Sequence, residues 1–149
     1  MQEEFWRKKP LHAMSAEEWE ALCDGCARCC LVKLEDEDAG TVYFTNVACR
    51  LLNISSCRCT DYADRSRRVP GCLVLTPQNL ADYLNILPPS CAYKRLYMRQ
   101  DLPPWHPLVT GQNSSVHDYA SVSGKCVSER YIHPEQLAAH VADWPEQEP

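Results

Sequence analysis

Ten cysteines in 149 residues constrain this chain more than any other feature of its sequence. Four of them, Cys23, Cys26, Cys29 and Cys30, form the pattern C-x2-C-x2-C-C. Two cysteines with two residues between them let one turn of backbone present two sulfur atoms to a single ion. Soft thiolate ligands suit zinc and iron–sulfur centres, whereas calcium and magnesium prefer oxygen ligands. The spacing therefore predicts a cysteine-bound metal.

A second group of cysteines follows the first along the chain. Eight thiolates would fill two four-thiolate zinc sites, or one four-iron cluster and one zinc site. Because four adjacent thiols would crowd one small ion, we expect some of the first group to share a metal with the second. The candidate metal ligands are Cys23, Cys26, Cys29, Cys30, Cys49, Cys57, Cys59 and Cys72.

The identity of the metal stays open between zinc and iron, including a four-iron–four-sulfur cluster. The first three cysteines match the start of the ferredoxin run C-x2-C-x2-C-x3-C-P. Cys30 then follows directly, and no Cys-Pro stands at the expected place, although Cys72 is a candidate remote fourth ligand. Cys91, His106 and His117 are further candidate ligands, whereas Cys126 lies apart from the cysteine motifs.

The remaining composition bears on compartment and partners. The first ten residues show no apolar signal core, and no window approaches the ~18 to 20 apolar residues of a membrane span. We therefore expect a cytoplasmic protein with no membrane partner, in which clustered thiols stay reduced and bind metal. The net charge of −5 argues against a nucleic-acid partner. A metal ion, and also a protein, are the expected partners.

Local patterns predict helices joined to a short β-hairpin. Ser15 and Glu18 form a capping box that opens a helix over roughly 16–23. Two β-rich runs, 31–34 and 41–45, flank a glycine-containing loop and predict the hairpin.

Two later helices are expected, both with proline at or near the start. Thr76 and Pro77 begin one of them, which Pro88 and Pro89 end. The other covers 134–144.

Together these patterns predict a small, irregular and mostly helical α+β fold organised around cysteine-bound metal. Eleven prolines and only five glycines favour many fixed turns. With neither an internal repeat nor a flexible linker, residues 1–149 are expected to form a single domain. Within it, 1–13 is expected to be a lead-in arm and 145–149 a tail.

These motifs resemble those of the bacterial YcgN family. The resemblance rests on CDGCARCC at 23–30 with KLEDED at 33–38, on CRCTDY at 57–62 with VPGC at 69–72, and on LPPSCAY at 87–93. It covers nearly the whole chain, and the family is similar to the broader YkgJ-type domain with a zinc- or iron-chelating cysteine cluster. The resemblance implies a bound metal and the same eight candidate ligands, but no particular reaction.

Two classes of function are compatible with such a cluster. The first is a metal-binding protein, with structural zinc in an interaction module or with storage and handling of iron or zinc. The alternative is an iron–sulfur redox protein, or an enzyme that uses an open cluster position. A closed four-thiolate zinc site has no open position, whereas a catalytic centre needs one in a cleft. The sequence leaves the question of an enzyme open.

Overall fold

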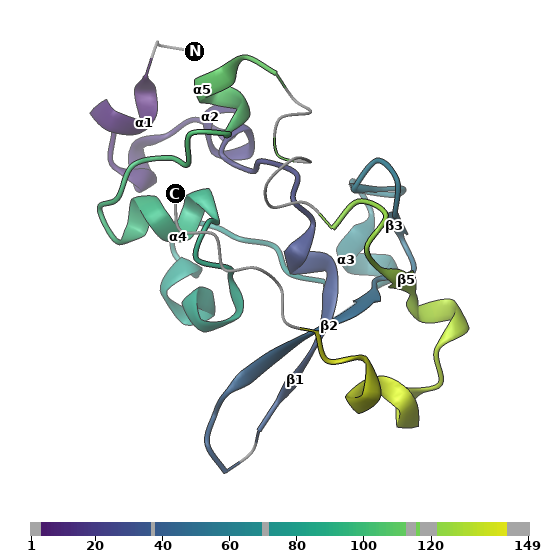
Figure 1. Ribbon diagram of the computed structural model, residues 1–149. Coiled ribbons are helices and arrows are strands. Elements are labelled where there is room, and N and C mark those ends of the chain that lie inside the picture. Colours follow the sequence, from purple (N-terminus) through teal and green to yellow (C-terminus); the bar gives the residue numbers. More distant parts are fainter. Residues whose placement is uncertain (1–3, 37, 70–71, 113–115, 117–121, 143–149) are drawn as a thin grey trace. The chain divides into compact units, whose positions relative to one another are not determined.

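The computed structural model describes residues 4–36, 38–69, 72–112, 116 and 122–142. Short helices and strands alternate with turns along this part of the chain (Figure 1). In chain order, with η for a 3-10 helix, they are α1 Phe5–Lys8, η1 Leu11–Ala13, α2 Ala16–Ala21, η2 Arg28–Cys30, β1 Leu31–Glu35, β2 Val42–Ala48, β3 Leu52–Asn53, β4 Arg58–Cys59, α3 Arg65–Arg68, η3 Leu80–Ile86, α4 Ala92–Tyr97, α5 Pro107–Thr110, β5 Val127–Ser128, η5 Glu129–Tyr131 and η6 Pro134–His140.

Helices and strands occur together in this small chain, as an α+β fold requires. Turns and irregular segments occupy much of the described chain, so the expectation of a mostly helical fold is not confirmed. No helix in the described ranges is both long enough and apolar enough to cross a membrane.

Backbone contacts divide the chain into two compact units. The first unit comprises Met1–Cys26, Leu75–Ala120 and Glu146–Pro149, and the second comprises Ala27–Val74 and Ser121–Pro145. The cysteine motif at 23–30 therefore contributes residues to both units. Whether the units act as one domain stays a prediction.

In the first unit, α2 begins at the predicted capping box. The side chain of Ser15 accepts the backbone N–H of Glu18, and the carboxylate of Glu18 accepts the backbone N–H of Ser15. Trp19 then joins α2 to α4, because Tyr93 donates its hydroxyl to the carbonyl of Trp19 at 2.8 Å and the two rings lie 4.7 Å apart. The helix ends at Ala21, two residues before the predicted end.

The expected lead-in arm contains structure of its own. Residues 5–8 form α1, and Phe5 is buried with 1% of its surface exposed. Arg7 also pairs with Asp101 at 2.6 Å. The arm therefore contributes an apolar side chain and an ion pair to the first unit.

His106 is fully buried in the first unit, where it caps α5. Its Nδ1 accepts the backbone N–H of Leu108 at 3.0 Å, and its Nε2 lies 2.7 Å from the carbonyl oxygen of Leu22. Because Nδ1 accepts a hydrogen bond, Nε2 carries the ring proton and donates it to Leu22. The imidazole is therefore neutral, and burial lowers the pKa of His106.

The two later helices form, but as 3-10 helices. Thr76 and Asn79 cap each other, since each side chain accepts the backbone N–H of the other residue. The helix η3 follows and ends just before Leu87. The last predicted helix is η6, which ends at His140, and Trp144 lies outside the described residues.

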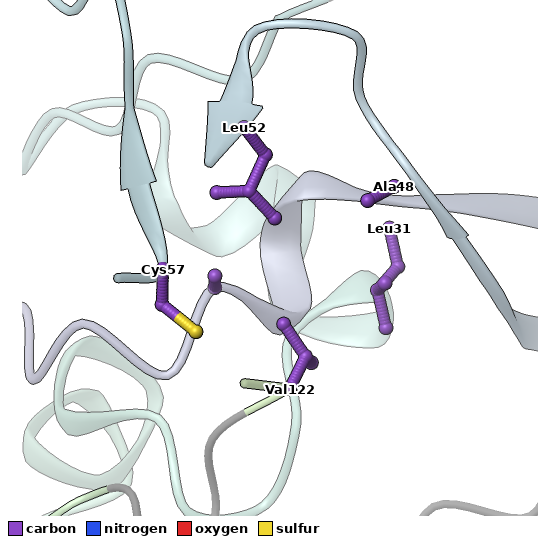
Figure 2. Close-up of a cluster of buried hydrophobic side chains, with 6 residues drawn as sticks. Leu31, Ala48, Leu52, Cys57 and Val122 are labelled. Carbon is purple, nitrogen blue, oxygen red and sulfur yellow. The ribbon is translucent and has the colours of Figure 1, made fainter. Parts of the chain in front are cut away.

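The second unit is built on the predicted hairpin. β1 and β2 pair antiparallel, with Leu31 opposite Ala48 and Glu35 opposite Val42, and β5 pairs in parallel with β2. Apolar side chains from the hairpin and the following turns form one cluster (Figure 2). Its buried members are Ala27, Leu31, Ala48, Leu52, Cys57 and Val122.

Loss of the α2 cap should lower stability measurably. We expect Ser15→Ala to reduce the free energy of unfolding by about 1 kcal/mol, because the backbone N–H of Glu18 loses its acceptor. Urea unfolding followed by circular dichroism would measure this change. Ser66→Ala, at an exposed position inside α3, is the control and should change stability little. Equal losses in both variants would contradict the capping role.

The neutral state of His106 should make stability depend on pH. Because its pKa is lower when folded than the ordinary 6.5, the unfolded chain binds the proton first as pH falls. His106 then contributes full stability above pH 6.5 and progressively less as the pH drops toward the folded pKa. Urea unfolding between pH 8 and pH 5 should show a weaker pH dependence in His106→Gln than in the wild type. An unchanged slope in the variant would contradict this assignment.

Candidate metal centre

All ten cysteines lie within the described ranges, and they are thiols rather than disulfides. Cys23, Cys26 and Cys91 belong to the first unit. Cys29, Cys30, Cys49, Cys57, Cys59, Cys72 and Cys126 belong to the second unit. The candidate metal ligands are therefore described for each unit separately.

The hairpin brings Cys30 and Cys49 of the second unit together. Cys30 directly precedes β1 and Cys49 directly follows β2, so the pairing of Leu31 with Ala48 makes them neighbours. The backbone N–H of Cys49 donates to the carbonyl of Cys30 at 2.8 Å. Antiparallel pairing thus joins the two cysteine groups that lie nineteen positions apart in the sequence.

A second strand pair brings Cys59 to the same region. Leu52 lies opposite Cys59 in the pairing of β3 with β4. The backbone N–H of Leu52 also donates to the carbonyl of Cys49 at 2.9 Å. The short turn from Cys49 into β3 therefore connects both cysteines.

Hydrogen bonds around α3 connect Cys72 to this region. The guanidinium of Arg50, next to Cys49, donates to the carbonyl of Arg68 at 2.6 Å. Farther along the chain, the backbone N–H of Cys72 donates to the carbonyl of Val69 at 2.8 Å. These bonds hold the end of α3 beside the turn that carries Cys49.

The pKa values of two thiols show which cysteines interact. Hydrogen bonding with Cys29 raises the pKa of Cys30, as do burial and the charges of Cys29, Cys49 and Cys72. Burial also raises the pKa of Cys72, against the attraction of Arg65, and charges at Cys49, Cys59 and Cys29 add to it. Five thiols are therefore within electrostatic range, and we call them the five-thiol group: Cys29, Cys30, Cys49, Cys59 and Cys72.

The donor chemistry of the five-thiol group fits zinc or iron. A hydrogen bond with Cys29 and burial raise the pKa of Cys30, burial raises that of Cys72, and neighbouring cysteines add to both, so a bound cation would favour the thiolate forms. Within the described ranges, no three His, Cys, Asp or Glu side chains are already grouped to hold one ion. Binding therefore requires some thiols to rotate toward one another.

Cys57 lies in a different, apolar setting. It is 5% exposed, has a left-handed φ of 58° and belongs to the cluster that contains Val122 (Figure 2). Its electrostatic neighbour is Cys126, whose pKa is raised by burial and then by Cys57. The hydroxyl of Ser123 donates to the carbonyl of Ser55 at 2.7 Å and ties their two loops together. The structure thus groups Cys57 with Cys126, which was not expected to be a ligand.

The other candidate ligands are placed as follows. Both ring nitrogens of His106 contact backbone groups, so His106 offers no nitrogen to a metal in this arrangement. His117 lies outside the described residues. Cys91 occupies the N-cap position of α4 in the first unit. Metal ligation by any of the eight candidate cysteines stays a prediction.

Sequence reasoning passed over two buried charged residues inside the cysteine motif. Asp24 is 7% exposed, and Arg28 is 3% exposed with its guanidinium 5.4 Å from the centre of the Phe44 ring. A charged residue is rarely buried without a role in pairing or binding. The sequence feature that could have pointed to Asp24 and Arg28 is their position between the cysteines of the motif at 23–30.

Comparison with known proteins bears on both the domain and the family. A family model named CxxCxxCC, with the description "Putative zinc- or iron-chelating domain", matches residues 22–92. No solved structure matches the chain. This match agrees with the expected zinc- or iron-chelating cysteine cluster, while the name YcgN is not confirmed.

Nearly the full length of the chain is similar to bacterial proteins of one family. A UPF0260 protein of Gluconobacter oxydans is 57% identical over 142 residues, which cover 95% of this chain and 85% of the relative. A UPF0260 protein of Parvibaculum lavamentivorans is 52% identical over 97% of this chain and 94% of its own length. The corresponding protein of Azotobacter vinelandii is 49% identical over 93% of both chains. The chain therefore belongs to the UPF0260 protein family.

Proposed function

We propose that this protein binds zinc or iron through cysteine thiolates, with the five-thiol group as its main centre. The observation that carries the proposal is the convergence of thiols from three separate segments, through the hairpin, the β3–β4 pair and the end of α3. Deprotonation of several neighbouring thiols to thiolates is unfavourable unless a cation offsets their charge. A metal shared by these segments would join them, and structural zinc contributes ~10 to 16 kcal/mol in small domains.

The proposed role is a metal-stabilised interaction module or a metal-handling protein. Four thiolates complete a tetrahedral zinc site, so the five-thiol group holds one more thiol than a closed site requires. The match to a zinc- or iron-chelating domain supports both metals. We place the protein in the cytoplasm, where its thiols stay reduced, with a protein as the proposed macromolecular partner.

A second candidate function is favoured by the exposure of Cys29. Its neighbours Cys30 and Cys49 are half-buried, whereas Cys29 is exposed to solvent. An iron–sulfur centre in this group would therefore have a side accessible to a small reactant or an electron-transfer partner. Such a centre would supply redox chemistry or an open iron position, and the chain would contribute its thiolate ligands.

Metal and acid-labile sulfide content distinguish the two candidates. Protein purified without oxygen and without an affinity tag should contain bound metal under both candidates. Colourless protein with zinc and no sulfide would support the interaction or handling role. Brown protein with iron and sulfide would support the iron–sulfur centre. A protein that is purified without metal and binds neither added zinc nor added iron would contradict the proposed function.

Substitution of one thiol tests the five-thiol group directly. Cys49→Ser should lose at least one bound metal and lower the melting temperature, because Cys49 is a neighbour of Cys30 and of the β3 turn. Elemental analysis and thermal unfolding would record both effects. Cys126→Ala is the matched control, since Cys126 lies in the same unit, is also half-buried and neighbours Cys57 instead. Equal metal loss in the control, or none in Cys49→Ser, would contradict the grouping.

A further inference from the structure

Asp24 stands between the two cysteines of the C-x2-C pair in the first unit, and its carboxylate is buried. Asp24 and Cys26 are 7% and 8% exposed. Oδ1 of Asp24 accepts the backbone N–H of Cys26 at 3.0 Å, which holds the carboxylate against the backbone of Cys26. In the described part of the chain, Oδ2 is buried and has no hydrogen-bond partner.

No group in the described ranges balances the charge of this carboxylate. A buried carboxylate oxygen without a partner is unfavourable, because burial removes the water that would solvate it. Among the described residues, no lysine or arginine forms an ion pair with Asp24. His106 is within electrostatic range of Asp24, but its Nδ1 accepts a hydrogen bond, so the ring is neutral. The carboxylate therefore has no cationic partner among the described residues, and a bound metal ion would supply one.

The neighbours of Asp24 define which cation would fit. Cys23 and Cys26 supply sulfur one residue before and two residues after the carboxylate. Gly25 and Ala27, with φ of 80° and 63°, turn the backbone sharply around these three residues. Two sulfurs and one carboxylate oxygen suit zinc or ferrous iron, whereas calcium and magnesium take oxygen ligands only. Cys23 is exposed, so an ion can enter from solvent.

We propose that Asp24 is an oxygen ligand of a zinc or ferrous ion that Cys23 and Cys26 also bind. This inference rests on the proposed metal-binding function and extends it, because the expected ligands were all cysteines. Two thiolates and one carboxylate leave a tetrahedral ion one further position. Because these three side chains are not already grouped around one point, binding requires Cys23 and Cys26 to turn their sulfur atoms toward Oδ2 of Asp24.

The test is the substitution Asp24→Asn, which keeps the size of the side chain and the acceptor for the backbone N–H of Cys26. It removes the negative charge and the carboxylate ligand. Zn²⁺ affinity, measured by competition with a chromophoric chelator, should fall at least ~10-fold. Loading with Co²⁺ should give ligand-field absorption bands shifted from those of the wild type.

Asp36→Asn is the matched control. Oδ1 of Asp36 also accepts backbone N–H groups, those of Asp38 and Ala39, at 2.9 and 3.2 Å. The substitution changes the net charge equally, but in a hairpin turn outside the motif at 23–30. Zn²⁺ affinity and Co²⁺ bands should match those of the wild type. Equal loss of affinity in this control would overturn the assignment, since charge alone would explain the effect.

The remaining outcomes separate this inference from the proposed function. Unchanged affinity and unchanged Co²⁺ bands in Asp24→Asn, together with metal loss in Cys26→Ser, would overturn the role of Asp24 alone. A wild type that binds neither Zn²⁺ nor Co²⁺ would overturn the proposed function as well. Metal-free Asp24→Asn should melt at or above the temperature of the metal-free wild type, because a buried charge is removed. A lower melting temperature would assign a structural role to Asp24 and overturn its role as a ligand.

Discussion

The antiparallel pairing of β1 with β2 is the constraint on which the candidate metal centre depends. The residues at the open end of this hairpin are Cys30 and Cys49, and one backbone hydrogen bond of 2.8 Å joins them. A slip of the register by one residue would turn every side chain of a strand to the opposite face. The apolar cluster that includes Leu31 and Ala48 opposes such a slip, so packing and the thiol arrangement support each other.

In the five-thiol group, the protein without a bound metal disfavours the charged thiolate forms of its cysteines. A hydrogen bond with Cys29, burial and neighbouring cysteine charges raise the pKa of Cys30, and burial followed by neighbouring cysteine charges raises that of Cys72. In the first unit, Asp24 presents a buried carboxylate oxygen with no partner among the described residues. Both units therefore concentrate acidic groups that a cation would stabilise. We regard this shared property as the physical basis of the proposed metal binding.

Local signals in the sequence were reliable where the interactions themselves are local. The capping box of Ser15 and Glu18, the hairpin and the stop before Pro88 all depend on residues a few positions apart, and the structure contains each of them. The length of α2 and the 3-10 form of η3 depend on packing around short segments, which sequence patterns do not report. The structure therefore differs from these two expectations in where α2 ends and in whether η3 is an α-helix or a 3-10 helix.

The sequence by itself determined that cysteines dominate this protein, because thiol spacing is a chemical property of the chain. Only the tertiary structure decided which thiols meet. It groups Cys49, Cys59 and Cys72 with the end of the first motif, and it pairs Cys57 with Cys126 instead. Strand register and burial make that choice, since they bring distant residues together. Burial likewise distinguishes Asp24 from the exposed acidic residues, because only loss of solvent leaves a carboxylate in need of a cation.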